Sequence, residues 1–433
     1  MPRPRSRRAP TVEALETRRL LAAGDLVGAP ATRDSYHVDG GGMAVAVIDT
    51  GVNYAHEALG GAIGPGHKVA AGYDFADNNP DPSPAPGPQH GTAVAGLIAS
   101  ADPANPGVAP GAGILPLRVF DNNGKGSFAA IAAALQWVID NHAQYHITVV
   151  NLSISDGSNN TRNWNAQDGG VGQQISGLID QLDRLDIPVV TAAGNSFGGP
   201  QGMGFPAIDP ETISVSALGA DGRLAADAQR LGAAAGGPSA TKLVAPGEGL
   251  IAPVQNNDFA PVSGTSFSAA LVSGAVVLLQ QIYQARFGTL PSVAAVEGWL
   301  QTGSDPVADP TTASTFDRLD IPKAAALVPS PAPPPTPAPA PVSTPAPSPA
   351  PIATPPAPSP APAPTPAPIA TPTPVTITPA PAAILPAGPL SARQDRLIRH
   401  AARVLVARAH PAAPRVKRVH VVGIRRSRAA TAG

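Results

Sequence analysis

The chain has 433 residues, of which 54 are proline and none is cysteine, and its formal net charge is −1. The lack of cysteine excludes disulfides, thiol catalysis and thiolate metal sites. The small total charge hides three blocks, because residues 1–20 carry +4, residues 391–433 carry +10 and the stretch between them carries −15. Since phosphate binding needs a basic face, this acidic body argues against a nucleic-acid partner.

The N-terminal residues 1–30 are predicted to form a basic export or surface-type segment. Their apolar run, Leu20–Gly24, is too short for the core of a conventional signal peptide. Residues 13–21 resemble the short Leu-Glu-Pro-Arg-x-Leu-Leu segment at the start of many exported or surface bacterial proteins, with Thr17 in place of the proline. This resemblance implies an exported, extracellular or cell-surface protein, and a plain basic tail is the alternative.

Residues 31–327 alternate short β-branched runs with longer periodic ones, which predicts an α/β domain with a mainly parallel sheet. Near-continuous apolar strands indicate helices on both faces of that sheet. The predicted strands cover residues 43–48, 114–119, 147–154, 187–193 and 212–217. The predicted helices cover residues 127–145, with Ser127 as a cap, and residues 174–185. The apolar run 269–283 is too short to span a bilayer, so it predicts a buried core helix and no transmembrane helix.

Beyond the predicted domain, residues 328–390 are a low-complexity segment that holds 26 of the prolines. Such a composition favours extended polyproline II, so we expect a disordered but stiff linker, about 190 Å long if fully extended. Residues 391–433 form a basic tail with two open interpretations. It contacts an anionic cell-envelope polymer or membrane surface, or it is a solvated disordered tail.

Four short glycine-bearing segments carry the chemistry: VAVIDTG (45–51), HGTAVAG (90–96), TAAGN (191–195) and SGTSFS (263–268). They supply Asp49, His90, Asn195 and Ser266, the carboxylate, imidazole, amide and hydroxyl that an acyl-transfer site needs. Each has an ordinary structural explanation by itself: a turn Asp, a core His, a turn Asn and a helix-capping Ser. Their single occurrence, in this order and within one α/β domain, favours catalysis.

From about residue 40 to 325 the sequence closely resembles the subtilisin-like serine proteases, the subtilases of the peptidase S8 family. The resemblance implies the three-layer subtilisin-like fold and a hydrolase that cleaves peptide bonds of proteins. It implies that Ser266 is the nucleophile, His90 the general acid and base, and Asn195, with the backbone N–H of Ser266, the oxyanion donor. Asp49 would orient His90. An α/β-hydrolase would instead show Gly-x-Ser-x-Gly with the serine first.

The resemblance also implies a substrate groove for an extended polypeptide. Its walls would be Ser153, Ile154 and Ser155 on one side and Ala192, Ala193 and Gly194, part of the S1 pocket, on the other. Ser155 stands where the family usually has glycine, and Ala270 and Leu271 replace its usual Pro-His. About 40 residues precede the first catalytic strand, so we expect no folding-assisting, inhibitory prodomain.

The chemistry implied by the resemblance requires no cofactor. In DFADNNPDPS (74–83), Asp74, Asp77 and Asn79 have a spacing that resembles a calcium loop of some heat-stable subtilases. Such oxygen ligands suit Ca²⁺, and plain Asp-Asn-Pro turns are the alternative. We expect a monomeric serine endopeptidase. The rival hypothesis is a non-catalytic, protease-like surface module kept for binding.

Overall fold

The computed structural model describes residues 22–331, except residue 88 and residues 165–169. The start of the predicted N-terminal segment, the predicted linker from residue 332 onward and the whole predicted tail lie outside the described residues. The division into four regions therefore stays a prediction.

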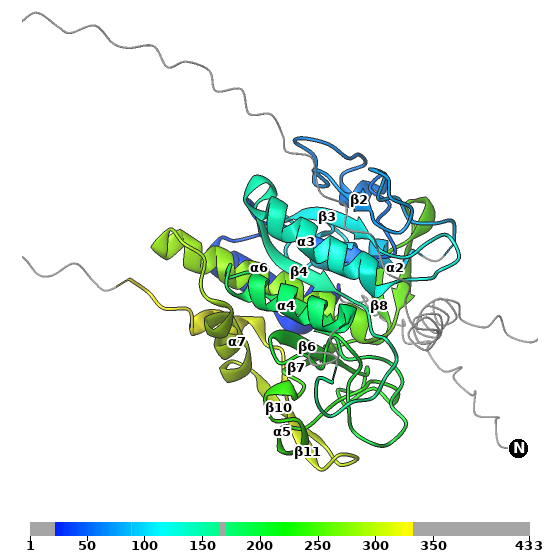
Figure 1. Ribbon diagram of the computed structural model, residues 1–433. Coiled ribbons are helices and arrows are strands. Elements are labelled where there is room, and N and C mark those ends of the chain that lie inside the picture. The colour runs from blue at the N-terminus through cyan, green and yellow to red at the C-terminus, as the bar shows by residue number, and fades with distance from the viewer. Residues whose placement is uncertain (1–21, 88, 165–169, 332–433) are drawn as a thin grey trace, which may run out of the picture. The chain divides into compact units, whose positions relative to one another are not determined.

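A nine-stranded sheet is the centre of the described chain (Figure 1). Its strand order is β10-β11-β7-β6-β5-β4-β1-β3-β2, and all neighbours are parallel except β10 and β11. Strands β8 and β9 form a separate antiparallel hairpin. The strands are β1 (Ala44–Asp49), β2 (Tyr73–Asp74), β3 (Gly113–Arg118), β4 (Ile147–Leu152), β5 (Val189–Ala192), β6 (Thr212–Leu218), β7 (Leu243–Pro246), β8 (Leu250–Pro253), β9 (Phe259–Val262), β10 (Asp305–Asp309) and β11 (Ser314–Arg318).

Helices cover both faces of this sheet, as the apolar strands predict. The α-helices are α1 (Ala29–Tyr36), α2 (His90–Ala99), α3 (Phe128–Tyr145), α4 (Val171–Asp183), α5 (Ala233–Gly236), α6 (Thr265–Phe287), α7 (Val293–Thr302) and α8 (Ile321–Ala326). Short 3-10 helices are Ala23–Val27, Glu57–Leu59, Gly237–Ser239 and Gln255–Asn257.

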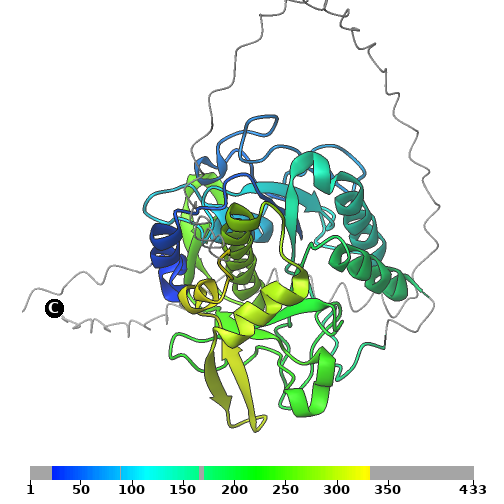
Figure 2. The same cartoon turned by 90° about the vertical axis from the view of Figure 1, so that its left-hand side faces the viewer.

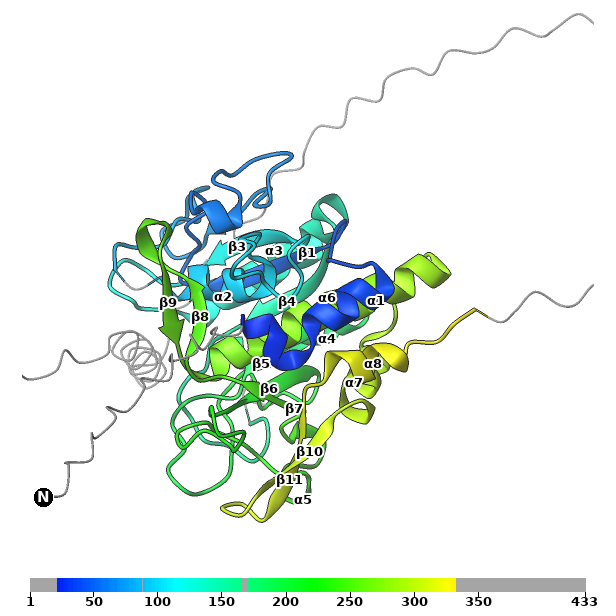
Figure 3. The ribbon, with the colours of Figure 1, turned by 180° about the vertical axis from the view of Figure 1, so that it is seen from behind.

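The two faces have separate apolar cores, which arise from the alternation of side chains along each strand. In β1, Val45 and Val47 belong to the apolar core that includes α2 and α6, whereas Ala46 and Ile48 belong to the core that includes α3 and α4. Figure 2 shows α3 and α4 on one side of the sheet and α1 on the other, and Figure 3 shows α1, α2 and α6 on the face opposite to α3. The prediction of a three-layer α/β fold is confirmed.

Helix α6 is the central core helix, as the apolar run predicts. It contacts β4, β5, β6 and β7, and nearly all of its residues up to Ile282 are buried. Among the described residues α6 alone is long and apolar enough to cross a membrane, but 94% of its most apolar window is buried inside the protein. It begins four residues earlier than predicted, so Ser266 lies inside its first turn.

The predicted elements match the structure to within a few residues, and Ser127 caps α3 by accepting a hydrogen bond from the Ala130 N–H at 3.0 Å. The prediction missed most elements after Leu218. Strands β10 and β11 have five residues each, lie at one edge of the sheet and contain several polar or charged residues. Such short, polar edge strands give only a weak sequence pattern.

Candidate active site

Asp49 is the last residue of β1, at the carboxyl edge of the sheet where parallel α/β folds place their sites. Its side chain is 1% exposed. Strand β1 lies between β3 and β4, so Asp49 is in the interior of the sheet and not at an edge strand. The Thr50 N–H donates to Asp49 Oδ1 at 2.6 Å, which fixes the carboxylate group.

His90 is the first residue of α2 and contacts Asp49 directly. Its Nδ1 lies 2.8 Å from Asp49 Oδ1 and 3.0 Å from Oδ2. With Nδ1–H donating to the carboxylate, Nε2 carries the free lone pair of the ring. The His90 Nε2 atom is buried and has no hydrogen-bond partner among the described residues. The ring is therefore oriented by Asp49 and presents an unused basic nitrogen.

Gly91 explains how α2 comes so close to β1. A β-carbon at this position would lie 2.3 Å from the Gly51 carbonyl oxygen and 3.1 Å from the β-carbon of Asp49. The first of these distances is shorter than any real contact of a side-chain carbon. The glycine after His90 thus permits the close approach that forms the carboxylate–imidazole pair.

Ser266 is the second residue of α6, and its side chain is 2% exposed. The Ser266 hydroxyl donates to the Ser153 carbonyl oxygen at 3.3 Å, and the Ser153 hydroxyl donates to the Ser266 carbonyl oxygen at 2.8 Å. The Ser266 hydroxyl therefore faces Ser153, while His90 Nε2 stays unpaired. The rings of His90 and Phe267 lie 5.1 Å apart, so the first turn of α6 packs against the imidazole.

Asn195 lies just beyond β5 and is held against the start of α6. Its Oδ1 accepts a hydrogen bond from the Thr265 N–H at 2.9 Å. The neighbouring Gly194 N–H donates to the Thr265 hydroxyl oxygen at 3.2 Å. Because Oδ1 is used in this way, the Nδ2 amide is the group that can donate to a ligand beside Ser266. The structure thus brings Asn195 next to Ser266 and pairs His90 with Asp49.

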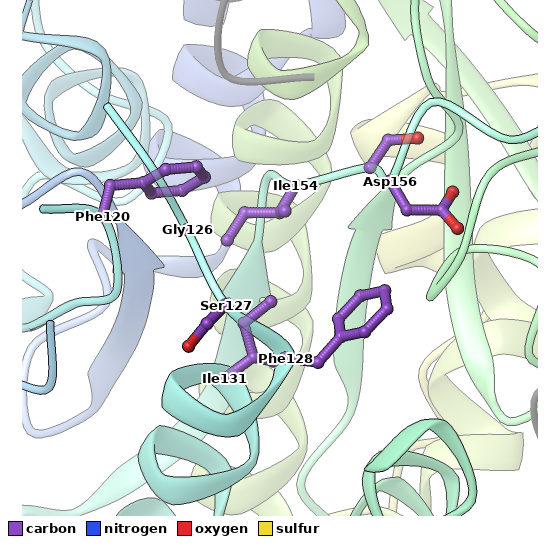
Figure 4. Close-up of a pocket in the computed structure, with 8 residues that line it drawn as sticks. Phe120, Gly126, Ser127, Phe128, Ile131, Ile154 and Asp156 are labelled. Carbon is purple, nitrogen blue, oxygen red and sulfur yellow. The ribbon is translucent and has the colours of Figure 1, made fainter. Parts of the chain in front are cut away.

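The two predicted substrate walls continue β4 and β5, which pair side by side up to Leu152 and Thr191. On one wall, Ile154 is buried and lines an apolar pocket together with Phe120, Phe128 and Ile131 (Figure 4). Ala192, Ala193 and Gly194 form the other wall and are buried. Ser155 is half-buried and follows Ile154 at the edge of the same pocket.

Two of the predicted calcium residues, Asp74 and Asp77, lie beside the guanidinium of Arg118. Arg118 NH1 lies 2.8 Å from Asp74 Oδ2, and Arg118 NH2 lies 3.6 Å from Asp77 Oδ2. Asp74 also accepts hydrogen bonds from the N–H groups of Ala76 and Asp77 and from the Asn79 side-chain amide. The guanidinium thus supplies the positive charge that calcium would bring, and the described residues contain no group of three or more His, Cys, Asp or Glu side chains placed to hold a metal ion.

Several residues of the site had no sequence signal of their own. A buried chain of hydrogen bonds runs from the Ser273 hydroxyl to Asn151 Oδ1 at 2.9 Å, and from Asn151 Nδ2 to the Ser153 hydroxyl at 2.9 Å. Through Ser153 it reaches the Ser266 carbonyl. Gln229 contacts Gly194 from a distant loop through a 2.8 Å backbone hydrogen bond. Only the fold brings these residues together.

Comparison with known proteins agrees with this geometry. Residues 40–316 match the family model described as the subtilase family. The chain is 34% identical over 242 residues to the "Thermophilic serine proteinase" of Bacillus sp. (strain AK1), covering 55% of this chain and 52% of that protein. It is 30% identical over 245 residues to "Thermitase" of Thermoactinomyces vulgaris, covering 56% and 76%, and 29% identical over 244 residues to "Subtilisin E" of Bacillus subtilis (strain 168), covering 55% and 56%.

The matched region spans little more than half the length of most of these relatives. The family model nevertheless covers more than half of this chain, including all four predicted catalytic residues. On the sheet topology, the site geometry and this match together, the chain belongs to the subtilase family.

Proposed function

We propose that this chain is a serine endopeptidase that hydrolyses peptide bonds of proteins through an acyl-enzyme. The proposal rests on the His90 ring. Asp49 holds the ring through Nδ1. Its buried Nε2 has no hydrogen-bond partner among the described residues, and the ring packs against the first turn of α6. A carboxylate-oriented imidazole with a free nitrogen is the base that a serine nucleophile requires.

In the first step, Ser266 Oγ attacks the carbonyl carbon of the scissile bond and its proton passes to His90 Nε2. The Ser266 hydroxyl must first turn about its Cα–Cβ bond, away from the Ser153 carbonyl that it contacts in the free protein. Catalytic hydrogen bonds are often long or differently directed before substrate binds. Asp49 stabilises the imidazolium that results and does not itself take the proton.

The negative charge that develops on the carbonyl oxygen is stabilised by two donors. Asn195 Nδ2 is available because Oδ1 is bound to the Thr265 N–H. The Ser266 N–H lies at the N-terminus of α6, where the helix dipole favours negative charge. Collapse of the tetrahedral intermediate breaks the C–N bond, and His90 gives its proton to the departing amine. Water then repeats the sequence on the acyl-enzyme, with His90 again taking and returning a proton.

The substrate is an extended polypeptide bound between the walls Ser153–Ser155 and Ala192–Gly194. The shallow apolar pocket beside Ile154 offers apolar contact surface to a side chain of that polypeptide, since its lining includes Phe120, Phe128 and Ile131. Burial of such a side chain is favourable by about 25 cal/mol for each Å² removed from water. These steps use side-chain and backbone groups of the chain itself, so no cofactor takes part in them.

Hydrolysis of casein tests this function. The native chain should degrade casein and react with a fluorophosphonate, and Ser266→Ala should do neither while keeping its fold. A folded native chain that neither cleaves nor labels contradicts the enzyme. If that chain binds a partner and Ser266→Ala binds it equally well, the rival interpretation of a non-catalytic binding module is the better one.

For the basic tail we propose contact with an anionic surface of the cell envelope after export. Its net charge of +10 supports this, because clustered Arg and Lys are attracted to anionic polymers and lipids. Deleting residues 391–433 should release the protein from envelope fractions and leave casein hydrolysis unchanged. Equal retention of the full and shortened chains contradicts the proposal and favours a solvated tail.

A further inference from the structure

The two walls of the proposed groove come unusually close beside Gly194, one residue before Asn195. A β-carbon on Gly194 would lie 2.0 Å from Gln229 Oε1 and 2.9 Å from Ser155 Oγ. Gly194 also has a φ of +112°, which side chains rarely adopt. Two side-chain oxygens from different segments therefore lie within 3 Å of one point next to the proposed oxyanion donor.

Ser155 reaches this point from the opposite wall. A β-carbon on Gly204 would lie 2.0 Å from Ser155 Oγ, so this hydroxyl occupies space that both Gly194 and Gly204 leave open. Gly204 belongs to the second wall, because its N–H donates to the Ala193 carbonyl at 3.1 Å. The Gly157 N–H donates to Ser155 Oγ at 3.3 Å and helps to hold it there. The Ser155 side chain thus extends from one wall to the other.

Gln229 Oε1 lies beside the same point, and the Gln229 side chain is fully buried. Its Nε2 donates to the Ser158 carbonyl and to Asn159 Oδ1, both at 2.8 Å, which fixes the direction of the amide. Its Oε1 is buried without a hydrogen-bond partner among the described residues. Because the two Nε2 hydrogen bonds hold the amide, Oε1 stays beside Gly194 and occupies space there.

The position of this constriction relative to the chemistry decides which part of a substrate it meets. In the proposed function, the scissile carbonyl carbon lies at Ser266 Oγ and its oxygen at Asn195 Nδ2. The side chain next to that carbonyl, on its acyl side, is two bonds from the carbonyl carbon. This side chain must therefore enter between the segment beside Ser266 Oγ and the segment beside Asn195 Nδ2. Ser153, which contacts Ser266, begins one segment, and Gly194, which precedes Asn195, ends the other.

We propose that Ser155 and Gln229 restrict the residue on the acyl side of the cleaved bond to glycine, alanine or serine. The inference rests on the proposed endopeptidase function and adds its substrate class. A larger side chain would have to displace the Ser155 hydroxyl from between the two glycines, and Gln229 Oε1 already fills the space beside Gly194. Pocket contacts of this size change relative rates by roughly 10- to 200-fold.

Peptides that differ only in the acyl-side residue test this directly. For the native chain, kcat/KM should be at least tenfold higher with alanine or serine than with leucine or phenylalanine. Ser155→Gly removes the hydroxyl and should raise the ratio of kcat/KM for leucine or phenylalanine to that for alanine at least tenfold. Ser304→Gly, the same substitution after α7, is the matched control and should keep the native preference.

A second measurement needs no variant and separates the two levels of the proposal. Mass spectrometry of denatured casein cut by the native chain should place glycine, alanine or serine before most cleaved bonds. Cleavage mainly after leucine or phenylalanine, or a folded and fluorophosphonate-reactive Ser155→Gly with an unchanged preference, overturns this inference alone. A native chain that neither cleaves casein nor labels overturns the endopeptidase function itself.

Discussion

Ser153 and Ser266 exchange two hydrogen bonds, each hydroxyl donating to the backbone carbonyl of the other residue, at 2.8 and 3.3 Å. This reciprocal contact joins the wall that continues β4 to the first turn of α6. It holds the proposed nucleophile in a resting direction and fixes its backbone. Ser153 is itself fixed by Asn151, so the position of Ser266 depends on a buried polar chain behind the site.

Loss of the Ser153 hydroxyl should lower both the stability and the rate. Ser153→Ala leaves the buried Asn151 Nδ2 without its acceptor, which should lower the free energy of unfolding by roughly 1–3 kcal/mol. It should also lower kcat by about tenfold or more, because a small displacement of the nucleophile disturbs its alignment. Ser268→Ala is the matched control. Ser268 lies near Ser266 at the start of α6, but its hydroxyl donates to the Ala245 and Pro246 carbonyls of β7. The control should lose stability and keep kcat, and equal kcat values in both variants contradict the positioning role.

Removal of the proposed oxyanion donor should act on the transition state. Asn195→Ala should lower kcat by about 10²- to 10³-fold and leave KM nearly unchanged, because the Nδ2 donor matters most when the oxygen becomes charged. Asn195→Asp keeps an acceptor for the Thr265 N–H but lacks the donor, so it should lose at least as much activity. Native kcat in the Asp variant, with an intact fold, would show that Asn195 only supports the loop.

Arg118 should replace calcium in the loop that follows β2. Arg118→Met leaves the Asp74 carboxylate buried without its cation and should destabilise the protein by roughly 3–5 kcal/mol. The exposed pair of Arg318 and Asp305 gives a matched control, and Arg318→Met should cost less than about 1 kcal/mol. EDTA should leave the unfolding temperature of the native chain unchanged. If EDTA lowers the unfolding temperature, added calcium restores it and Asp77→Asn removes the effect, the loop holds a calcium site instead.

Two buried carboxyl groups should make stability depend on pH. Burial raises the pKa of Asp156 and that of Asp209, although both accept hydrogen bonds. The folded state therefore holds these protons more tightly than the unfolded chain, where the pKa is near 3.8. Their contribution to stability is complete below pH 3.8 and is lost as the pH rises through the raised folded values.

Urea unfolding of Ser266→Ala, which avoids self-digestion, measures this effect between pH 4 and pH 7. Adding Asp156→Asn should flatten the curve, since the amide keeps an acceptor for the Phe205 N–H and cannot ionise. Asp140→Asn, on the exposed face of α3, should leave the curve as it was. An Asp156→Asn curve parallel to that of its parent contradicts the assignment to Asp156.

The sequence predicted the parallel α/β framework, and it predicted that His90 lies against Asp49. Asp49 ends the buried strand β1, Asn195 follows β5 and Ser266 lies in the first turn of α6, so the alternation of strands and helices places them at one edge of the sheet. The direction of the Ser266 hydroxyl could not be predicted, because it depends on Ser153, 113 residues away. The ion pair of Asp74 with Arg118 was also hidden, since it requires the parallel register of β2 and β3. Gln229 gave no signal either, because only the folded chain brings its loop to Gly194.

The most direct test of the account is the identification of the residue that reacts with a fluorophosphonate. Peptide mapping of the labelled native chain should place one adduct on Ser266, and labelling should fall by several orders of magnitude in His90→Ala, since the hydroxyl then lacks its base. Ser268→Ala should label like the native chain. An adduct on another serine, or full labelling of Ser266 without His90, would contradict the proposed catalytic site.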